Sequence, residues 1–169
     1  KKLNRPSAIL SFNPHPRQFF SRELDQYQIL SEEKKQLIFT ELGIDHYFCL
    51  KFDELLSNLS PVDFIKKIIV DQLKVEKLIV GYDFRFGKDR KGDTNLLLDH
   101  GKIHGFNLET IEQITNPKTK TPYSSTDIRE CIRTGEIEEA NLLLGRPWSM
   151  QGKVIHGDKR ARKMNFPTA

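Results

Sequence analysis

The chain has 169 residues, of which 37% are hydrophobic and 30% are charged, and its formal net charge at neutral pH is +4. This composition is typical of a soluble globular protein with one full-sized core and room for the edge of a second domain. No apolar run approaches the roughly 20 residues that a membrane-spanning helix needs. Residues 1–6 also lack the apolar centre of a signal peptide.

Cysteine usage and charge narrow the expected surroundings and partners. Cys49 and Cys131 are the only cysteines, so we predict no disulfide framework and no zinc site, and we expect a reducing cytoplasm. The positive charge is compatible with anionic ligands, from nucleotides to nucleic acid. The basic residues gather at 85–91 and 159–163 without the arginine-rich or repeated aromatic pattern of a nucleic-acid platform. Composition alone favours an ordinary solvated basic surface, and we expect neither nucleic acid nor a membrane as a partner.

The first third of the chain predicts two strands with a helix between them. Residues 7–12 form a short apolar strand that must end at 13–16, where two prolines restrict the backbone. A helix is expected after Ser31, a good N-cap followed by two acidic residues, and it should end at Gly43. Residues 44–50 predict a second strand. The apolar stripe expected on the helix consists of Leu37, Ile38 and Leu42.

The middle of the chain predicts two more helices and two more strands. Ser60 and Pro61 begin a helix, because a capping residue precedes a proline at the first helical position. Residues 78–81 predict a third strand, residues 92–94 open a helix, and residues 106–111 predict a fourth strand. The apolar residues at helical spacing after Pro61 are Ile65, Ile68, Ile69 and Leu73.

The last part of the chain changes in character after Pro147. Before it, Ser124 or Ser125 caps a helix that ends near Gly135, and a short helix over 138–144 stops at Gly145. Strands that alternate with helices favour βαβ units in an open parallel sheet. After it, residues 151–155 are strand-like and residues 157–169 are basic and not helical, so we predict a domain boundary near 147–150.

Two segments that follow predicted strands could meet a ligand. Residues 12–16 could present Asn13 or His15, although a plain strand exit with a surface histidine explains them as well. Residues 78–93 place Asp83, Phe84 and Phe86 after a strand, at the edge where α/β sheets bind ligands. Asp83 could bind a sugar or purine, and the two rings could pack on a planar ligand. The alternative is two core phenylalanines beside an exposed turn.

Two later segments could bind phosphate. Hydroxyls at 124–126 lie at a helix start, where free backbone N–H groups and the positive end of the helix dipole favour anions. Arg129 follows Ser125 by one turn and can point at the same anion; the alternative is a capped helix with a surface ion pair. In the basic segment 152–169, Thr168 could offer a hydroxyl to Mg²⁺, and the alternative is an exposed basic tail.

Taken in order, these segments resemble the prokaryotic bifunctional riboflavin kinase/FMN adenylyltransferases, also called FAD synthetases. The resemblance covers nearly the whole chain. It implies an α/β fold: a Rossmann-like nucleotidyltransferase domain with a parallel sheet over 1–147, followed by the start of a β-barrel riboflavin kinase domain over 148–169. The phrases that carry the resemblance are FNPHPRQFF, VGYDFRFGKDRKGD, SSTDIR, LLGRPWSMQGKVIHGDKRARK and NFPTA.

The resemblance implies FAD biosynthesis with ATP, FMN and riboflavin as substrates and Mg²⁺ as cofactor. The first domain would transfer AMP from ATP to FMN, and the second would phosphorylate riboflavin. Ser125 and Arg129 would be the catalytic residues at the ATP phosphates, with Ser124 and Thr126 beside them, and Thr168 would help hold Mg²⁺ and ATP. The residues implied for the nucleotide and flavin pocket are Asn13, His15, Asp83, Phe84 and Phe86.

The sequence also departs from the family pattern. The family's Gly-x-Phe-Asp-Gly-x-His-x-Gly-His segment and the strand that belongs with it are not in the 169 residues, and the kinase motif stops at Ala169. Ala161 and Asn165 stand where the family usually has glycines. We therefore expect an internal piece of a longer protein that is inactive by itself.

Two other functions remain open from the residues. One is a related nucleotidyltransferase that uses another acceptor, such as a pantetheine phosphate or nicotinamide mononucleotide. The other is a non-catalytic flavin- or RNA-binding module, which the sequence pI of about 9.0 would suit.

Overall fold

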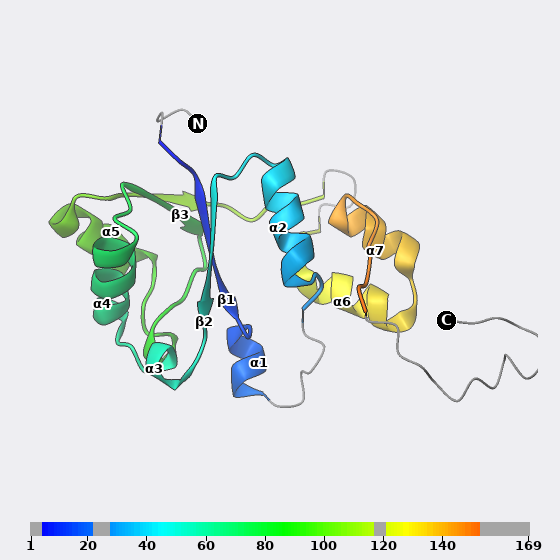
Figure 1. Ribbon diagram of the computed structural model, residues 1–169, viewed down its shortest axis with the longest axis horizontal. Helices are drawn as coiled ribbons and strands as arrows, with labels where there is room; N and C mark the ends of the chain where they lie inside the picture. The colour runs from blue at the N-terminus through cyan, green and yellow to red at the C-terminus, as the bar shows by residue number, and fades with distance from the viewer. Residues whose placement is uncertain (1–4, 22–27, 117–120, 153–169) are drawn as a thin grey trace, which may run out of the picture.

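Two pairs of parallel strands lie among helices in a mixed α/β arrangement (Figure 1). The computed structural model describes residues 5–21, 28–116 and 121–152. Strand β1 (Ala8–Asn13) pairs with β2 (His46–Lys51), and β3 (Lys77–Gly81) pairs with β4 (Asn107–Ile111). The registers place Ala8 opposite His46 and Lys77 opposite Asn107. All four strands lie within two residues of their predicted bounds.

The single open sheet predicted from the sequence is wrong for the described residues, whose strands form two separate two-stranded sheets. Each pair is a βαβ unit, so the local prediction of parallel pairing is confirmed. Side chains instead of a backbone ladder connect the pairs: Arg5 Nε donates to Glu76 Oε2 at 3.0 Å, just before β3. A shared hydrophobic core contacts strands of both pairs.

Helices cover both faces of the β1–β2 pair. In Figure 1, α4 and α5 lie on one side of these strands, and α2, α6 and α7 lie on the other. The helical elements are α1 (Pro16–Phe20), α2 (Glu32–Glu41), α3 (Glu54–Ser57), α4 (Pro61–Phe64), the π-helix η1 (Ile65–Gln72), the 3₁₀ turn η2 (Lys88–Arg90), α5 (Thr94–His104), α6 (Ser125–Thr134) and α7 (Ile137–Leu144).

The predicted helix starts are confirmed by side-chain caps. Ser31 Oγ accepts from the Lys34 backbone N–H at 3.2 Å, and Ser60 Oγ accepts from the Asp63 N–H at 3.0 Å. Ser124 rather than Ser125 is the N-cap of α6. These contacts satisfy N–H groups that the first helical turn leaves without partners. The short helices α1 and α3 were not predicted, because four or five residues carry no readable periodicity.

The predicted apolar stripe on α2 is only partly correct. Ile38 is buried, whereas Leu37 is 54% exposed and Leu42 is 66% exposed. The helix packs on β2 through a narrow face, on which the Phe39 and Tyr47 ring centroids lie 5.1 Å apart. Leu37 is turned about 100° from Ile38 around the helix axis, and Leu42 is already the C-cap. Both leucines therefore miss that face.

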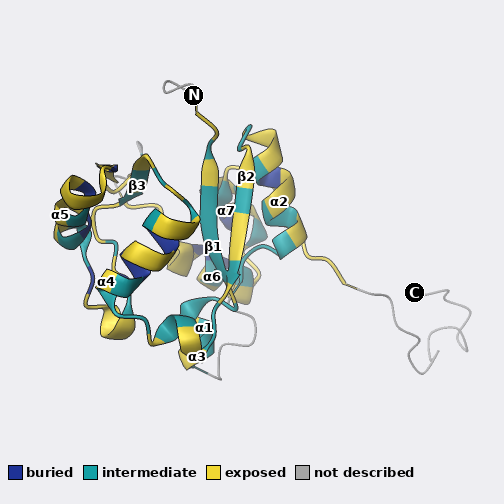
Figure 2. Ribbon diagram, turned by 60° about the vertical axis from the view of Figure 1, so that its left-hand side comes forward, coloured by how far each residue is buried: buried dark blue, intermediate teal, exposed yellow. Residues whose placement is uncertain are grey.

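The helix predicted after Pro61 changes type along its length. Its first turn is α-helical, and from Ile65 it is a π-helix, whose end is marked by the Leu73 N–H donating to the Ile68 carbonyl. The predicted apolar face is nevertheless the buried one. The core cluster (Figure 2 shows buried residues on this helix in dark blue) comprises Phe64, Ile65, Ile68, Ile69, Phe86, Leu97 and Phe106.

Gly92 lies where any side chain would collide with this core. A Cβ at this position would stand 2.7 Å from the Phe86 ring, and the Phe86 and Gly92 backbones form an isolated antiparallel bridge. Gly92→Ala should therefore lower the free energy of unfolding by about 1–3 kcal/mol, the usual cost of overpacking a core. Urea unfolding would measure the change.

Gly152→Ala is the matched control for this prediction. Nothing lies within 4 Å of the position of its Cβ, so the free energy of unfolding should stay within about 0.5 kcal/mol of the original. Equal stabilities of the two variants would contradict the close packing of Phe86 on Gly92.

Candidate active site

His15 stands at the end of β1 and at the start of α1. Its Nδ1 accepts from the Arg17 backbone N–H at 3.2 Å, so His15 is the N-cap of α1, with Pro16 at the first helical position. With Nδ1 used as an acceptor, a neutral ring carries its proton on Nε2. His15 is thus a fixed donor at the carboxyl end of β1, the edge at which parallel α/β units bind ligands.

The first turn of α6 presents hydroxyls and an arginine. Ser124 Oγ accepts from the Thr126 N–H at 3.1 Å and caps the helix. Arg129 Nη1 donates to Ser125 Oγ and to the Ser125 carbonyl, both at 3.0 Å. The guanidinium is therefore folded back toward the helix start, where the dipole is also positive. This is the convergence that the sequence predicted for a phosphate.

His15 and Arg129 are close enough to influence each other. Burial lowers the pKa of His15, and the positive charges of Arg129, Arg17 and Lys35 lower it further. The end of β1 and the start of α6, more than a hundred residues apart, thus form one positively charged region with a neutral histidine in it. Such a region suits an anion with several charges, such as a polyphosphate.

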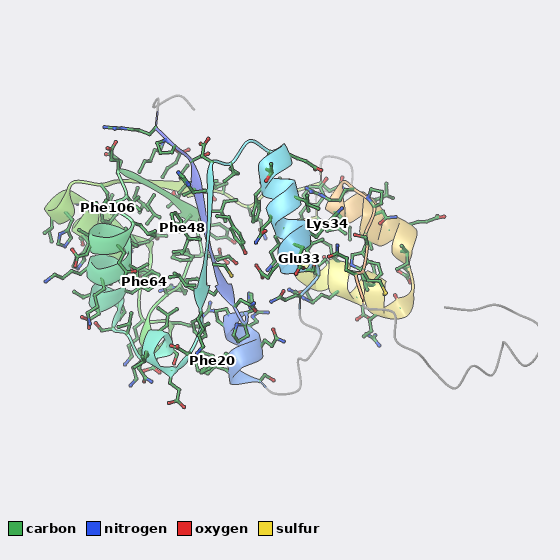
Figure 3. All side chains as sticks on the ribbon, viewed as in Figure 1. Phe20, Glu33, Lys34, Phe48, Phe64 and Phe106 are labelled. Atoms are coloured by element: carbon green, nitrogen blue, oxygen red, sulfur yellow. The ribbon has the colours of Figure 1, made fainter. Side chains whose placement is uncertain are left out.

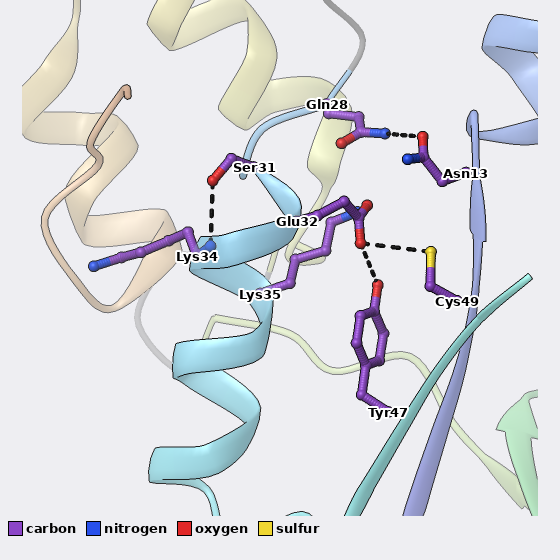
Figure 4. A network of polar contacts seen from close by, with 8 residues as sticks. All are labelled: Asn13, Gln28, Ser31, Glu32, Lys34, Lys35, Tyr47 and Cys49. Carbon is purple, nitrogen blue, oxygen red and sulfur yellow. Dashed lines mark hydrogen bonds and ion pairs between the residues drawn. The ribbon is translucent and has the colours of Figure 1, made fainter. Parts of the chain in front are cut away.

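A polar network holds the edge of this region next to α2 (Figure 4). Glu32 accepts from the Tyr47 hydroxyl at 2.7 Å and from Lys35 Nζ at 2.6 Å, and the Cys49 thiol approaches it at 3.5 Å. Gln28 Nε2 donates to Asn13 Oδ1 at 3.3 Å. The first residue of α2 therefore holds Lys35, and the segment that precedes the helix holds the amide of Asn13.

Protonation in this network follows from its hydrogen bonds. Burial alone would raise the pKa of Glu32, but the hydrogen bonds from Lys35 and Tyr47 outweigh it and the pKa is lowered. Burial and the bond to Glu32 raise the pKa of Tyr47, and burial raises that of Cys49. At neutral pH the network thus holds a carboxylate, a phenol and a thiol, with the charge of Lys35 directed to Glu32.

Phe84 and Phe86 differ in their exposure after β3. Their ring centroids lie 5.6 Å apart in a stacked arrangement, with Phe86 buried in the core and Phe84 half-buried above it. Asp83 is exposed at the end of the strand. The structure therefore leaves Asp83 and one face of Phe84 accessible, whereas Phe86 supports Phe84 from below.

Aromatic rings connect this segment to the end of β1. Phe64 lies 5.5 Å from Phe86 and 6.4 Å from Phe12, the residue before Asn13 (centroid distances). Figure 3 shows Phe64 inside the molecule, on the α4 side of the strands. The two segments that the sequence selected after β1 and β3 are therefore neighbours across a single ring.

A second group of rings joins α1 to the ends of β1 and β2 and was not selected from the sequence. Phe52 lies 5.3 Å from Phe19, 5.9 Å from Phe20 and 5.9 Å from Phe12, all edge-on (centroid distances). Phe20 is 71% exposed although it belongs to this cluster. An exposed ring on a rigid aromatic base beside a cationic region is a suitable surface for a flat ligand.

Sequence reasoning missed Arg17, Lys35 and these rings for definable reasons. Arg17, Phe19 and Phe20 stand inside the phrase FNPHPRQFF, but a helix of five residues gives no pattern to place them. Lys35 looks like an ordinary surface lysine paired with Glu32 on its own helix, until β2 brings Tyr47 to the same carboxylate. Thr168, Ala161 and Asn165 lie outside the described residues, so their predicted roles remain predictions.

The described part of the chain contains no group of three or more His, Cys, Asp or Glu residues that could hold a metal ion. Cys49 is an exposed free thiol and Cys131 is a buried one. Within the same residues, every helix is too short or too polar to cross a membrane.

Comparison with known proteins places the chain in a family. The family model for FAD synthetase matches residues 1–127. The chain belongs to the FAD synthetase family. A second family model, for riboflavin kinase, matches residues 144–169. The first match includes the predicted site residues from Asn13 to Thr126, whereas Arg129 follows its last residue.

Known proteins that are similar to this chain are about twice as long as it is. A bifunctional riboflavin kinase/FMN adenylyltransferase of Buchnera aphidicola subsp. Schizaphis graminum is 38% identical over 169 residues, which is 100% of this chain and 54% of that protein. The protein of that name from Pseudomonas fluorescens is 36% identical over 99% of this chain and 53% of its own length. The chain thus spans about half the length of the curated relatives it matches.

A solved structure supports the fold. A Streptococcus pneumoniae crystal structure, named as a macrolide-efflux protein, aligns with 98% of this chain and 53% of its own, with a TM-score of 0.76 and 24% sequence identity. The likeness concerns the fold alone.

The charge of Arg129 should be measurable at His15. Arg129→Ala should raise the pKa of His15 toward its ordinary value of 6.5 without reaching it, because burial remains the larger cause. A proton NMR titration of the histidine ring signals would show the shift, with His15→Asn identifying the signal. Asn is the matched replacement, because its side chain can still cap α1.

The sign for stability follows from the lowered pKa. As pH falls below 6.5, the unfolded chain takes up a proton at position 15 before the folded chain does, so stability falls until the folded pKa is passed. His15→Asn should lose less stability than the original over that range. Arg133→Ala, on the same helix but paired with Glu130, should leave the pKa of His15 unchanged, and an equal shift there would contradict the assignment.

Proposed function

We propose that the protein containing this chain makes FAD by transferring AMP from ATP to FMN, with pyrophosphate as the other product. Family membership supports the reaction class. The observation that carries the proposal is the convergence of His15 with the first turn of α6, where Ser125 and Arg129 meet the positive end of a helix dipole. A reaction between two phosphorylated substrates needs positive charge at this edge of the fold.

In the proposed reaction an FMN phosphate oxygen attacks the α-phosphorus of ATP, and the bond from that phosphorus to the bridging oxygen breaks. The electron pair leaves with pyrophosphate, so no protein nucleophile is required. Arg129 and the N–H groups of α6 would bind the charge that grows on the leaving group, and Ser125 would orient it. His15, kept neutral, would donate from Nε2 to a phosphate oxygen.

We propose the following roles for the other residues that the sequence predicted for the site. Asn13 would lie beside the nucleotide, Ser124 and Thr126 beside the phosphates, and Asp83 on a sugar or purine edge. Phe84 would offer its accessible face to a ring, with Phe86 supporting it. We propose Phe20, on its aromatic base, as a further surface for the flavin.

We further propose that residues 1–147 form the adenylyltransferase domain and residues 148–169 begin a β-barrel riboflavin kinase domain. Thr168 would help hold Mg²⁺ with ATP in that second domain. When bound, Mg²⁺ would neutralise phosphate charge.

The basic test uses the full-length protein that contains this chain. It is incubated with ATP, Mg²⁺ and FMN, and FAD and pyrophosphate are followed by chromatography. Pantetheine phosphate and nicotinamide mononucleotide serve as alternative acceptors. Formation of FAD in preference to the other products supports the proposal, and its absence alongside turnover of another acceptor overturns it.

Ser125→Ala and Arg129→Ala in the full-length protein should separate the two activities. Each variant removes a contact to charged phosphate oxygens, so kcat/KM for FAD formation should fall about ten- to a hundredfold. The two effects should be less than additive, because Arg129 donates to Ser125. Phosphorylation of riboflavin, measured in the same samples, should be largely retained.

Arg133→Ala is the matched control for these variants, since its exposed guanidinium pairs with Glu130 on the same helix. It should keep both activities. Parallel loss of both activities in the Ser125 and Arg129 variants would contradict the division into two domains.

Phe20→Ala tests the proposed flavin surface. Because Phe20 is 71% exposed, its removal should cost little stability, whereas KM for FMN should rise about five- to tenfold from the lost ring contact. Steady-state kinetics at saturating ATP would measure the change. Ile103→Ala on α5, at a side chain that is 70% exposed, is the control and should leave KM unaltered; an unchanged KM in both variants would remove Phe20 from the site.

A further inference from the structure

The segment that follows α7 is bonded to the segment that precedes α2. Trp148 Nε1 donates to the Ile29 carbonyl at 3.0 Å, and Ser31 Oγ donates to Gln151 Oε1 at 2.8 Å. These bonds join residues 119 and 120 positions apart in the sequence. In Figure 1 the orange segment after α7 runs back beside α2. Two parallel bonds between the same two segments fix both their distance and their register.

The C-terminal anchor of this bridge is itself held. The Trp148 backbone N–H donates to Asn141 Oδ1 at 2.6 Å, and Asn141 belongs to α7. The helix α7 packs on α6, the helix that carries Ser125 and Arg129. Trp148 is therefore attached to the α6–α7 pair on one side and to Ile29 on the other.

The N-terminal anchor leads directly to the site. Gln28, next to Ile29, donates to Asn13 at the end of β1. Ser31 caps α2, and Glu32 in the next position holds Lys35 and is held by Tyr47 (Figure 4). The positive charge of Lys35 also contributes to the lowered pKa of His15. A shift of residues 28–32 would therefore move the partners of Asn13 and the charge beside His15 together.

We infer that Trp148 and Gln151 are positioning residues for the ATP site: they hold residues 28–32 in register with the end of β1 and the start of α6. This inference rests on the proposed function for the identity of the ligand. Trp148 and Gln151 lie in the part of the chain that matches the riboflavin kinase family. The adenylyltransferase site is thus supported from the beginning of the following domain.

The contacts of Trp148 and Gln151 also predict which kinetic constants their removal would change. Trp148 and Gln151 touch no reacting group, so their removal should weaken the binding of ATP in the ground state and the transition state alike. KM and Kd for ATP should rise while kcat changes much less. A residue that only stabilised the fold would lower the melting temperature without this division between KM and kcat.

The test compares four variants of the full-length protein. Trp148→Phe keeps the ring but removes the Nε1–H donor, and Gln151→Met keeps the length of the side chain but removes the acceptor. Gln151→Glu keeps an oxygen acceptor and serves as the rescue. Met150→Ala changes a neighbouring side chain that is 77% exposed and serves as the matched control. Calorimetry gives Kd for ATP, and steady-state FAD formation gives KM and kcat.

Trp148→Phe and Gln151→Met should each raise Kd for ATP roughly three- to tenfold, the usual range for one lost hydrogen bond. Gln151→Glu and Met150→Ala should bind ATP as the original does. The indole N–H signal of Trp148, identified by its absence in Trp148→Phe, should shift when ATP is added. If Trp148→Phe folds poorly, the Kd for ATP of the Gln151→Met variant tests the inference by itself, because Gln151 is exposed and its replacement should not disturb folding.

The inference is overturned if both variants bind ATP like the original, or if they only melt at a lower temperature with an unaltered Kd. An indole signal that ignores ATP would also overturn it. Failure of the proposed function has a different signature: the original protein binds ATP but forms no FAD from FMN. In that case the ATP affinities of the four variants still test the positioning role by themselves.

Discussion

The packing of Phe64 between two other rings is the contact on which the rest of the structure depends. No backbone ladder joins the β1–β2 pair to the β3–β4 pair among the described residues, so side chains must do so. Phe64 contacts Phe12 on one side and Phe86 on the other, and the buried isoleucines of η1 fill the space behind it. Burial of large apolar side chains is the largest favourable contribution available here.

The polar residues of the candidate site lie at the edge of this apolar core. The strand that ends in Phe12 continues into Asn13 and His15, and the ring of Phe86 carries Phe84 above it. No buried polar or charged residue occurs in the described core, so the charged groups of the candidate site lie outside it. There Lys35 and Arg129, which come from different helices, both lie close enough to His15 to lower its pKa. Positive charge beside accessible rings is the physical feature on which the proposed binding of a nucleotide and a flavin rests.

The site is also a place where distant parts of the chain meet. The residues before α2 are attached to β1 by Gln28 and to the segment after α7 by Ile29 and Ser31. The α6–α7 pair therefore reaches the first strands through a few directional bonds as well as through packing. Directional bonds fix register more sharply than apolar contacts do, because they tolerate little displacement.

The sequence by itself determined the elements and the family. Periodicity and capping residues gave the strands and the longer helices, because each depends on neighbours within a few positions. The ordered motifs predicted Ser125, Arg129 and His15 as site residues, and these roles remain predictions. Only the tertiary structure decided that the strands form two pairs, that Leu37 and Leu42 stay exposed, and that Phe86 is buried while Phe20 is not. Only it brought Lys35 toward His15 and Trp148 to Ile29. These outcomes depend on contacts between residues far apart in the chain, for which local sequence carries no signal.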